Sequence, residues 1–364
     1  MNYYNLYKYQ KKAISFIKEK EKCALFLDMG LGKTATTLTA VKEMVYNFSV
    51  LRTLVIAPLK VSNQVWKQES ERWEHLKDLK INVCTGKPDQ RKKNLDEEAD
   101  IYVINREQIP WLVENYKWKW DCVIIDESSS FKSNRSLRFR ALKKVLKDIE
   151  KVILLTGTPS PNSLADLWPQ IFLIDQGERL GRTITQFRER YFDYNHFNFK
   201  WSIKDNCDKI IHNKISDICL TMKTEDYLTL PDKIDIYEFI DLPAKVKKQY
   251  KEFNKGFILE LKEKEIEAVS AGVLANKLLQ FCNGAIYDEN GLYHELHNEK
   301  LDRLEEILVD NPNENFFLAY NYKSDVERIM KKFPKAVKLS KSGEEIEEWN
   351  KGNIRLLLAH PASA

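Results

Sequence analysis

The sequence predicts an α/β protein built on a parallel sheet, and three observations support this fold class. Short apolar runs that can form strands recur at 23–27, 53–57, 101–104, 122–125 and 151–155. Helical stretches lie between them, including one after residue 34 in which Leu38, Val41 and Val45 fall on one face. Strands separated by helices imply right-handed crossovers and a sheet covered on both faces. Polar motifs directly follow three of the strands, at the edge where such sheets bind ligands.

Composition sets broad limits on the class of protein. The chain has 364 residues, 43% apolar and 31% charged, which is ordinary for a globular protein of two domains. The net charge of +4 permits nucleic-acid binding without arguing for it. The longest apolar runs are far shorter than the roughly 18–20 residues that span a bilayer, so no membrane association is expected. The six cysteines are scattered and form no C-x-x-C pair, which favours a reducing cytoplasm over a zinc site or a disulfide framework.

The first polar motif is LDMGLGKT at 27–34, which follows the apolar run 23–27. A glycine-rich loop between a buried strand and a helix start exposes successive backbone N–H groups, here those of Met29, Gly30, Leu31 and Gly32, which can hold nucleotide phosphates. Lys33 can reach the β- and γ-phosphates, and the Thr34 hydroxyl can bind Mg²⁺. The strict phosphate-loop pattern requires glycine at position 27, where this chain has leucine, so the motif depends on its context.

Two later motifs supply that context. The strand 122–125 ends in Asp126 and Glu127. Asp126 is predicted to hold Mg²⁺ through water, and Glu127 to orient or deprotonate the attacking water. The strand 151–155 ends in Thr156, Gly157 and Thr158, whose two hydroxyls are expected at the same edge. Each motif alone is commonplace, but a glycine loop, an acidic pair and a Thr-Gly-Thr turn after successive strands indicate an NTPase. The predicted catalytic residues are Lys33, Asp126 and Glu127, with Mg²⁺ held by Thr34 and Asp126.

These motifs resemble those of the superfamily-two helicase-like ATPases, specifically the Swi/Snf-like branch with its short phage and bacterial members. LYKYQKKAISFI (6–17) is similar to the entry motif of that branch, and the resemblance implies that Tyr9 and Gln10 bind the adenine. DMGLGKT resembles motif I, TLVIAPLKVSNQVWKQE (53–69) motif Ia, IDESSSFKS (125–133) motif II and LLTGTPSPNSLADLWPQ (154–170) motif III. NFFLAYNYKSDVERI (315–329) resembles motif IV, and 347–364 resembles the approach to motif V.

The resemblance implies two RecA-like lobes and an ATP-dependent motor that moves along double-stranded DNA, with ATP bound between the lobes. Other phage or bacterial DNA-processing proteins are candidate partners. Loops after strands and helix starts would contact the DNA backbone. The residues expected at this edge are Lys60, Ser62, Asn105, Arg106, Lys132 and Asn134. The resemblance also implies that Thr156, Gly157 and Thr158 couple nucleotide state to this edge.

Three segments are predicted along the chain. Residues 1–172 form the first, ATP-binding lobe, 173–231 a linker or helical insertion, and 232–364 a C-terminally incomplete second lobe. The aromatic and basic stretch TQFRERYFDYNHFNFKWSIK (185–204) can either dock on the first lobe or stack on bases. The second lobe is expected to begin with an edge strand at 232–242, followed by a long helix and a charged hairpin near 260–269. HELH at 294–297 lacks metal-site spacing and is interpreted as a turn or short strand pair.

One departure from the family leads to a further expectation. In the family, HPASA (360–364) continues into a segment whose arginines reach the γ-phosphate, so the 364-residue chain is expected to bind ATP but show little DNA-stimulated turnover. Three alternatives stay open. They are a true unwinding or RNA-directed helicase, a nucleotide-gated DNA-binding protein without turnover, and a small-molecule kinase, which Glu127 and the Thr-Gly-Thr strand disfavour.

Overall fold

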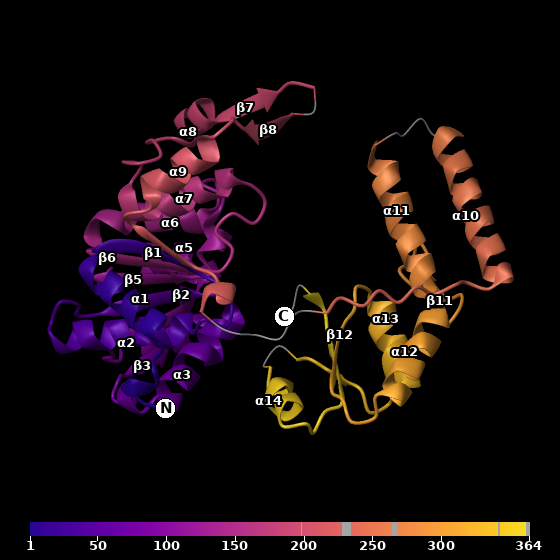
Figure 1. Ribbon diagram of the computed structural model, residues 1–364, viewed down its shortest axis with the longest axis horizontal. Coiled ribbons are helices and arrows are strands. Elements are labelled where there is room, and N and C mark those ends of the chain that lie inside the picture. Colours follow the sequence, from indigo (N-terminus) through magenta and orange to yellow (C-terminus); the bar gives the residue numbers. More distant parts are fainter. Residues whose placement is uncertain (198, 228–233, 264–267, 341–342, 362–364) are drawn as a thin grey trace. The chain divides into compact units, whose positions relative to one another are not determined.

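The structure is a computed structural model and describes residues 1–197, 199–227, 234–263, 268–340 and 343–361. The chain divides into two compact units, Met1–Pro231 and Asp232–Ala364 (Figure 1). No helix in the described part of the chain is long and apolar enough to cross a membrane.

The first unit is built on a seven-stranded sheet in which all neighbouring strands are parallel. This confirms the predicted α/β class. In spatial order the strands are β3 (Ile81–Val83), β4 (Ile101–Asn105), β2 (Thr53–Ala57), β5 (Cys122–Asp126), β6 (Lys151–Thr156), β1 (Lys22–Leu27) and β9 (Cys219–Met222). The strands expected at 53–57, 101–104, 122–125 and 151–155 are all present, within a residue of their predicted bounds.

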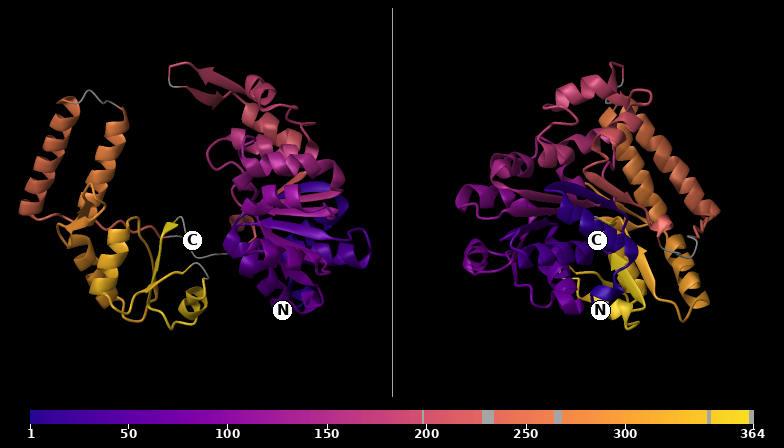
Figure 2. Two further views of the ribbon diagram at one scale, coloured as in Figure 1. Left: turned by 180° about the vertical axis from the view of Figure 1, so that it is seen from behind. Right: turned by 60° about the vertical axis from the view of Figure 1, so that its left-hand side comes forward.

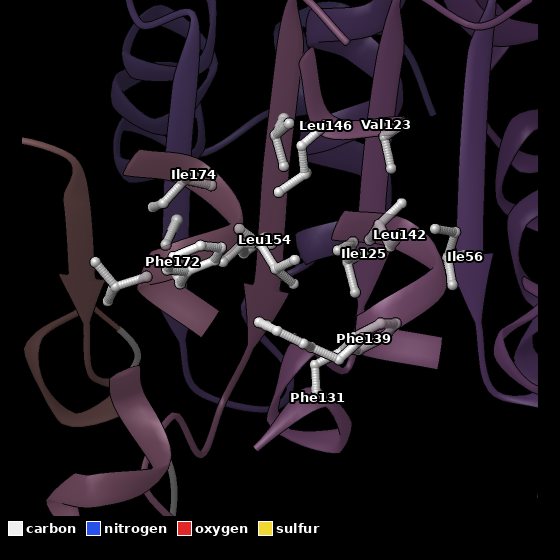
Figure 3. Close-up of a cluster of buried hydrophobic side chains, with 14 of the residues drawn as sticks. Ile56, Val123, Ile125, Phe131, Phe139, Leu142, Leu146, Leu154, Phe172 and Ile174 are labelled. Atoms are coloured by element: carbon white, nitrogen blue, oxygen red, sulfur yellow. The ribbon is translucent and has the colours of Figure 1, made fainter. Parts of the chain in front are cut away.

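Helices cover both faces of this sheet. They are α1 (Lys8–Glu19), α2 (Lys33–Tyr46), α3 (Trp66–Arg72), α4 (Pro88–Asp96), α5 (Ile109–Asn115), α6 (Leu137–Val145), α7 (Leu167–Asp175), α8 (Ile184–Tyr191) and α9 (Cys207–Ile215). Alternate residues of each strand belong to opposite hydrophobic clusters: in β1, Phe26 lies in one cluster and Leu25 in the other. Phe139 of α6 and Phe172 of α7 pack in the first cluster (Figure 3). Burial on both faces explains why these strands appear in the sequence as continuous apolar runs.

Short helical turns connect many of these elements. The 3₁₀ turns are η1 (Tyr3–Asn5), η3 (Glu74–Leu76), η4 (Arg106–Gln108), η5 (Ser128–Phe131), η6 (Leu146–Asp148), η7 (Leu164–Asp166) and η8 (Thr224–Asp226). A π turn, η2 (Val61–Val65), leads directly into α3. Several of these turns follow strands at the edge where the polar motifs lie, so they place the functional side chains.

The described residues from 173 to 227 belong to the first unit, where they pack on its core and extend its sheet. Phe187 and Tyr191 of α8 are buried in the hydrophobic cluster shared with α6 and α7. The antiparallel pair β7 (Phe192–Asn195) and β8 (Lys200–Ile203) projects from this region, as seen from behind in Figure 2. β9 lies inside the segment for which the sequence predicts a linker or insertion, and it pairs with β1 as the last strand of the sheet.

The second unit contains a three-stranded parallel sheet in the order β12 (Phe316–Ala319), β14 (Leu356–Ala359), β13 (Val337–Lys338). Its core is formed by Leu301, Leu308, Val326, Ile329 and Leu358, with others. The other elements are α10 (Ala244–Glu263), α11 (Ala268–Asn283), β10 (Ala285–Tyr287), β11 (Tyr293–Glu295), α12 (Glu299–Asp310), α13 (Lys323–Lys332) and α14 (Glu345–Asn350). HELH contributes to the β10–β11 strand pair.

One predicted element of this unit is wrong. The edge strand expected at 232–242 is absent from its described residues 234–242, which form neither strand nor helix. Ile236 and Phe239 are exposed there, although the alternating apolar pattern would suit a half-buried strand. The pattern alone is insufficient, because a strand also needs a neighbour that accepts its hydrogen bonds. The tip of the charged hairpin expected near 260–269 lies outside the described residues.

Candidate nucleotide-binding site

The three polar motifs lie at the ends of three adjacent strands, β5, β6 and β1. The register pairs Leu155 with both Leu25 and Asp126, and Phe26 with Thr156. The loops that follow these strands therefore meet at one edge of the sheet. A cavity of about 980 Å³ opens there, entirely within the first unit. It is lined by Met1, Asn5, Tyr7, Gln10, Met29, Gly30, Gly32, Lys33, Thr34, Ala35, Val65, Glu69, Arg72, Trp73 and Glu127.

The glycine loop needs glycine at position 32 for two reasons. Gly32 caps α2 with a left-handed backbone (φ 70°), and a Cβ built there would lie 2.4 Å from Gln10 Nε2. Gln10 Oε1 accepts the Tyr7 N–H at 2.9 Å, while its Nε2 lies 3.5 Å from the Leu31 carbonyl oxygen. The glutamine that the resemblance assigns to the adenine is therefore packed directly on the loop.

Lys33, the first residue of α2, folds back on its own loop. Its Nζ donates to the carbonyl oxygens of Leu27 at 2.8 Å and Asp28 at 3.2 Å. Burial lowers the pKa of Lys33, and the nearby carboxylates of Glu127, Asp126 and Asp28 oppose that shift. A partly buried ammonium that donates to two carbonyl oxygens and lines a polar cavity is well suited to exchange those carbonyls for phosphate oxygens.

Glu127 is held in place by two hydroxyls. Its Oε1 accepts hydrogen bonds from Ser129 Oγ at 2.6 Å and from Thr156 Oγ1 at 2.9 Å. Thr156 is fully buried, and its Oγ1 also accepts the Thr158 N–H at 3.1 Å. Thr156 thus joins the acidic pair at the end of β5 to the Thr-Gly-Thr turn at the end of β6. The loop at Gly157 also approaches the glycine loop closely, because a Cβ there would lie 3.2 Å from the Leu27 carbonyl oxygen.

Asp126 lies beside Glu127 in a more enclosed position. Its Oδ2 accepts the indole N–H of Trp66 at 3.0 Å, and its Oδ1 accepts the Glu127 N–H at 3.0 Å. Burial raises the pKa of Asp126, the Trp66 hydrogen bond opposes that shift, and the charge of Glu127 adds to it. Trp66 is a site residue that was not predicted, although it lies inside the stretch 53–69 that resembles motif Ia.

The cavity brings together most of the residues predicted to bind nucleotide, but not all of them. Gln10, Met29, Gly30, Gly32, Lys33, Thr34 and Glu127 line it. The side chain of Leu31 is instead buried in the core. Tyr9 is also buried, and its ring lies 5.0 Å from that of Tyr227 and 5.5 Å from that of Tyr7.

Two further contacts at this edge were not predicted. The Thr224 N–H donates to Asp28 Oδ2 at 2.9 Å, so the turn η8 that follows β9 is tied to the glycine loop. Ser128 Oγ lies 2.8 Å from Gln170 Oε1, and Gln170 Nε2 donates to the Pro159 carbonyl oxygen at 2.6 Å. This buried glutamine connects the turn after Glu127 with the turn after Thr158. Both contacts join residues far apart in sequence, for which the local pattern carries no signal.

The residues expected at a DNA-binding edge follow the ends of β2 and β4 and the turn η5. Lys132 is exposed and Asn134 is half-buried, while Arg106 pairs with Glu107 at 3.3 Å. Asn105 is largely buried and caps η4. Ser62 is 1% exposed, and its Oγ lies within 3.2 Å of the carbonyl oxygens of Ala57, Pro58 and Ile104. The side chain of Ser62 is therefore structural here and does not reach the surface.

Comparisons with known proteins agree with this architecture. The SNF2-related domain family matches residues 9–284. Putative protein p41 of Acyrthosiphon pisum secondary endosymbiont phage 1 is 36% identical over 370 residues, covering 98% of this chain and 80% of that protein. An uncharacterized ATP-dependent helicase of Mycoplasma genitalium is 27% identical over 288 residues, covering 77% of this chain but only 26% of its own length. The Sulfolobus solfataricus SWI2/SNF2 ATPase core, solved in complex with dsDNA, matches with a TM-score of 0.54 at 20% identity, covering 98% of this chain and 78% of that chain.

A parallel sheet with a phosphate loop, an Asp-Glu pair and a Thr-Gly-Thr turn at adjacent strand ends defines the helicase-like ATP hydrolases with RecA-like lobes. The family match covers most of the chain, and the phage protein aligns along nearly all of it. The chain belongs to the SNF2-related domain family.

Proposed function

We propose that this chain binds ATP with Mg²⁺ at the edge formed by β1, β5 and β6, hydrolyses it, and uses the cycle to move along double-stranded DNA. The observation that carries the proposal is the hydrogen bond of 2.9 Å from Thr156 to Glu127. Glu127 lines the same cavity as Lys33 and the glycine loop, and this hydrogen bond ties it to the end of a second strand, which supports a water-activating role for its carboxylate.

Different residues of the site would contribute to ATP binding and to hydrolysis. Lys33 would leave the carbonyl oxygens of Leu27 and Asp28 for the phosphates, where its charge is better compensated. Glu127, oriented by Thr156 and Ser129, would orient the attacking water and accept its proton. Gln10, which lines the cavity, would contact the adenine, while Tyr9 packs behind it against Tyr7 and Tyr227.

The donor set next to the glycine loop fits a magnesium ion. Thr34 supplies a hydroxyl and Asp126 a carboxylate, and Mg²⁺ prefers such oxygen ligands. When bound, the ion would neutralise developing charge on the phosphates. Oδ2 of Asp126 accepts the Trp66 N–H and Oδ1 accepts the Glu127 N–H, and each oxygen keeps a lone pair for a further interaction.

The DNA-facing part of the proposal rests on Lys60, Arg106, Lys132 and Asn134, which follow strand ends or lie on the turn after η5. Backbone contacts of this kind neutralise phosphates and are nearly independent of sequence. The SWI2/SNF2 core from Sulfolobus solfataricus was solved with dsDNA, which supports duplex DNA as the partner.

Hydrolysis is tested with Glu127→Gln. The variant should bind ATP and Mg²⁺ like the parent and lose hydrolysis, because the amide keeps the shape of the side chain but cannot take a proton. Hydrolysis at the parent rate would exclude Glu127 from the reaction.

Duplex binding is tested by titrating salt. Binding should weaken steeply as the salt concentration rises. Lys132→Ala should weaken binding equally on unrelated sequences, and it should reduce the slope of log K against log[salt] by about 1, the value expected for one lost phosphate contact. Lys93→Ala, which removes an exposed lysine of α4, is the matched control and should bind like the parent. A preference for one sequence that persists at high salt would contradict backbone tracking.

Strand separation is a second candidate function, favoured by the β7–β8 hairpin. Phe197 is 98% exposed and Phe199 77% exposed at its tip, while the guanidinium of Arg188 lies 5.7 Å from the Trp201 ring. Exposed aromatics beside cations can stack on unpaired bases. The parent should then displace a labelled strand from a forked duplex, and Phe197→Ala with Phe199→Ala should abolish displacement while leaving ATP hydrolysis intact. A parent that hydrolyses ATP without displacing strands would exclude this function.

A further inference from the structure

A buried indole holds the carboxylate proposed to bind the metal ion. Trp66 is 0% exposed, and its Nε1–H donates to Asp126 Oδ2 at 3.0 Å. The other carboxylate oxygen, Oδ1, accepts the Glu127 N–H, also at 3.0 Å. One donor on each oxygen fixes the plane of the carboxylate. Because only one of these donors is a side chain, it is the contact that substitution can remove.

The element that carries Trp66 is itself locked to the sheet. Trp66 is the first residue of α3 and follows the π turn η2, whose wider turn changes the direction in which later side chains point. Ser62 in that turn is buried, with its Oγ 3.1 Å from the Ala57 carbonyl oxygen at the end of β2 and 3.2 Å from that of Ile104 in β4. The indole is therefore aimed at Asp126 by a turn that is anchored to two neighbouring strands.

We propose that Trp66 is a positioning residue of the metal site: its indole N–H sets the orientation in which Asp126 presents its free lone pairs to the ion. The inference rests on the proposed function, because it concerns the metal that accompanies ATP. Hydrogen bonds to metal-binding carboxylates orient them, and loss of such a partner typically weakens metal affinity about 10–100-fold. The loss of metal affinity on removing the Trp66 N–H should be near the lower limit of this range, because the Glu127 N–H continues to hold Oδ1.

The alternative is that Trp66 only fills space in the core. Two replacements separate these roles. Trp66→Phe removes the N–H together with part of the ring. Replacing Trp66 with β-(3-benzothienyl)alanine removes only the N–H, because sulfur takes the place of that group in a ring system of the same shape. Trp168→Phe is the matched control, since Trp168 is also buried and donates its indole N–H to the Gly181 carbonyl oxygen at 2.8 Å, outside the site.

The experiment measures Mn²⁺ binding to the full chain by electron paramagnetic resonance, in the presence of a non-hydrolysable ATP analogue, so that no turnover is needed. Both Trp66 replacements should weaken Mn²⁺ binding by about tenfold. Their affinity for the analogue in EDTA should equal that of the parent, and Trp168→Phe should bind Mn²⁺ like the parent.

Two results would overturn the inference while leaving the proposed function standing. One is parent-like Mn²⁺ affinity in the benzothienyl variant, and the other is an equal loss in Trp168→Phe. A parent chain that binds no Mn²⁺ together with the nucleotide analogue would instead refute the proposed function, and the inference with it.

Discussion

Thr156→Val should slow ATP hydrolysis while leaving ATP binding unchanged. Valine has nearly the shape of threonine, so the fully buried site keeps its packing but loses the hydroxyl that donates to Glu127 at 2.9 Å. A hydrogen bond to a charged group contributes roughly 1.5–3 kcal/mol. Ser129 still donates to the same carboxylate oxygen at 2.6 Å, so we take the lower limit. If the activation free energy of hydrolysis rises by about 1.5 kcal/mol when this hydrogen bond is lost, the rate constant falls roughly tenfold.

Single-turnover hydrolysis of labelled ATP, at saturating duplex DNA and Mg²⁺, measures this effect even when turnover is slow. Thr156→Ser keeps the hydroxyl and should retain most of the parent rate constant. A Thr156→Val variant that hydrolyses at the parent rate, or a serine variant as slow as the valine variant, would refute the role assigned to this hydrogen bond.

Further predictions follow from the glycine loop and the buried thiols. Gly32→Ala should weaken nucleotide binding, measured by calorimetry, because a left-handed residue other than glycine costs about 1–2 kcal/mol and the new Cβ would displace the Gln10 amide; unchanged affinity would contradict the tight contact. Burial raises the pKa of Cys23, Cys84 and Cys122 from 9.0 to about 12. These thiols should therefore resist alkylation at pH 8 until the protein unfolds, and rapid labelling of the native protein would contradict their burial. Since only the unfolded chain ionises these thiols between pH 9 and 12, the free energy of unfolding should fall with pH in that range, by up to about 1.4 kcal/mol per pH unit for each thiol, and a flat dependence above pH 9 would argue against the shift.

The sequence predicts the first unit well because its strands are buried on both faces. Uninterrupted apolar runs followed by polar motifs form β2, β4, β5 and β6. Such runs are compatible with few stable structures other than a buried strand. β9 was missed, because it is a four-residue edge strand, CLTM, in which only Met222 is buried. The strand predicted at 232–242 shows the opposite error, since its alternating pattern lacks a neighbouring strand among the described residues.

Some residues of the candidate site could also be predicted from the sequence, and others could not. Lys33, Asp126, Glu127 and Thr156 could be located from sequence because each lies at the end of a strand or in the short segment that follows it, where topology fixes its place. Trp66 could not be located in this way, because the direction of its side chain depends on the π turn η2, which no local sequence pattern predicts. Ser62 is predicted at the DNA-binding edge because it follows the end of β2, and the fold adds that its hydroxyl is directed at backbone carbonyls.

The affinity of the chain for ATP, compared with that of Lys33→Ala, tests the central claim most directly. Binding of a fluorescent ATP analogue measures it without any need for turnover. The parent should bind in the presence of Mg²⁺, and Lys33→Ala should bind on the order of 100-fold more weakly, because an ammonium–phosphate contact contributes roughly 1.5–3 kcal/mol and the glycine loop loses the cation at its end. Lys42→Ala, on the same helix but paired with Asp78 outside the cavity, should bind like the parent. Equal affinities of the parent and Lys33→Ala would contradict the assignment of this loop as the phosphate site.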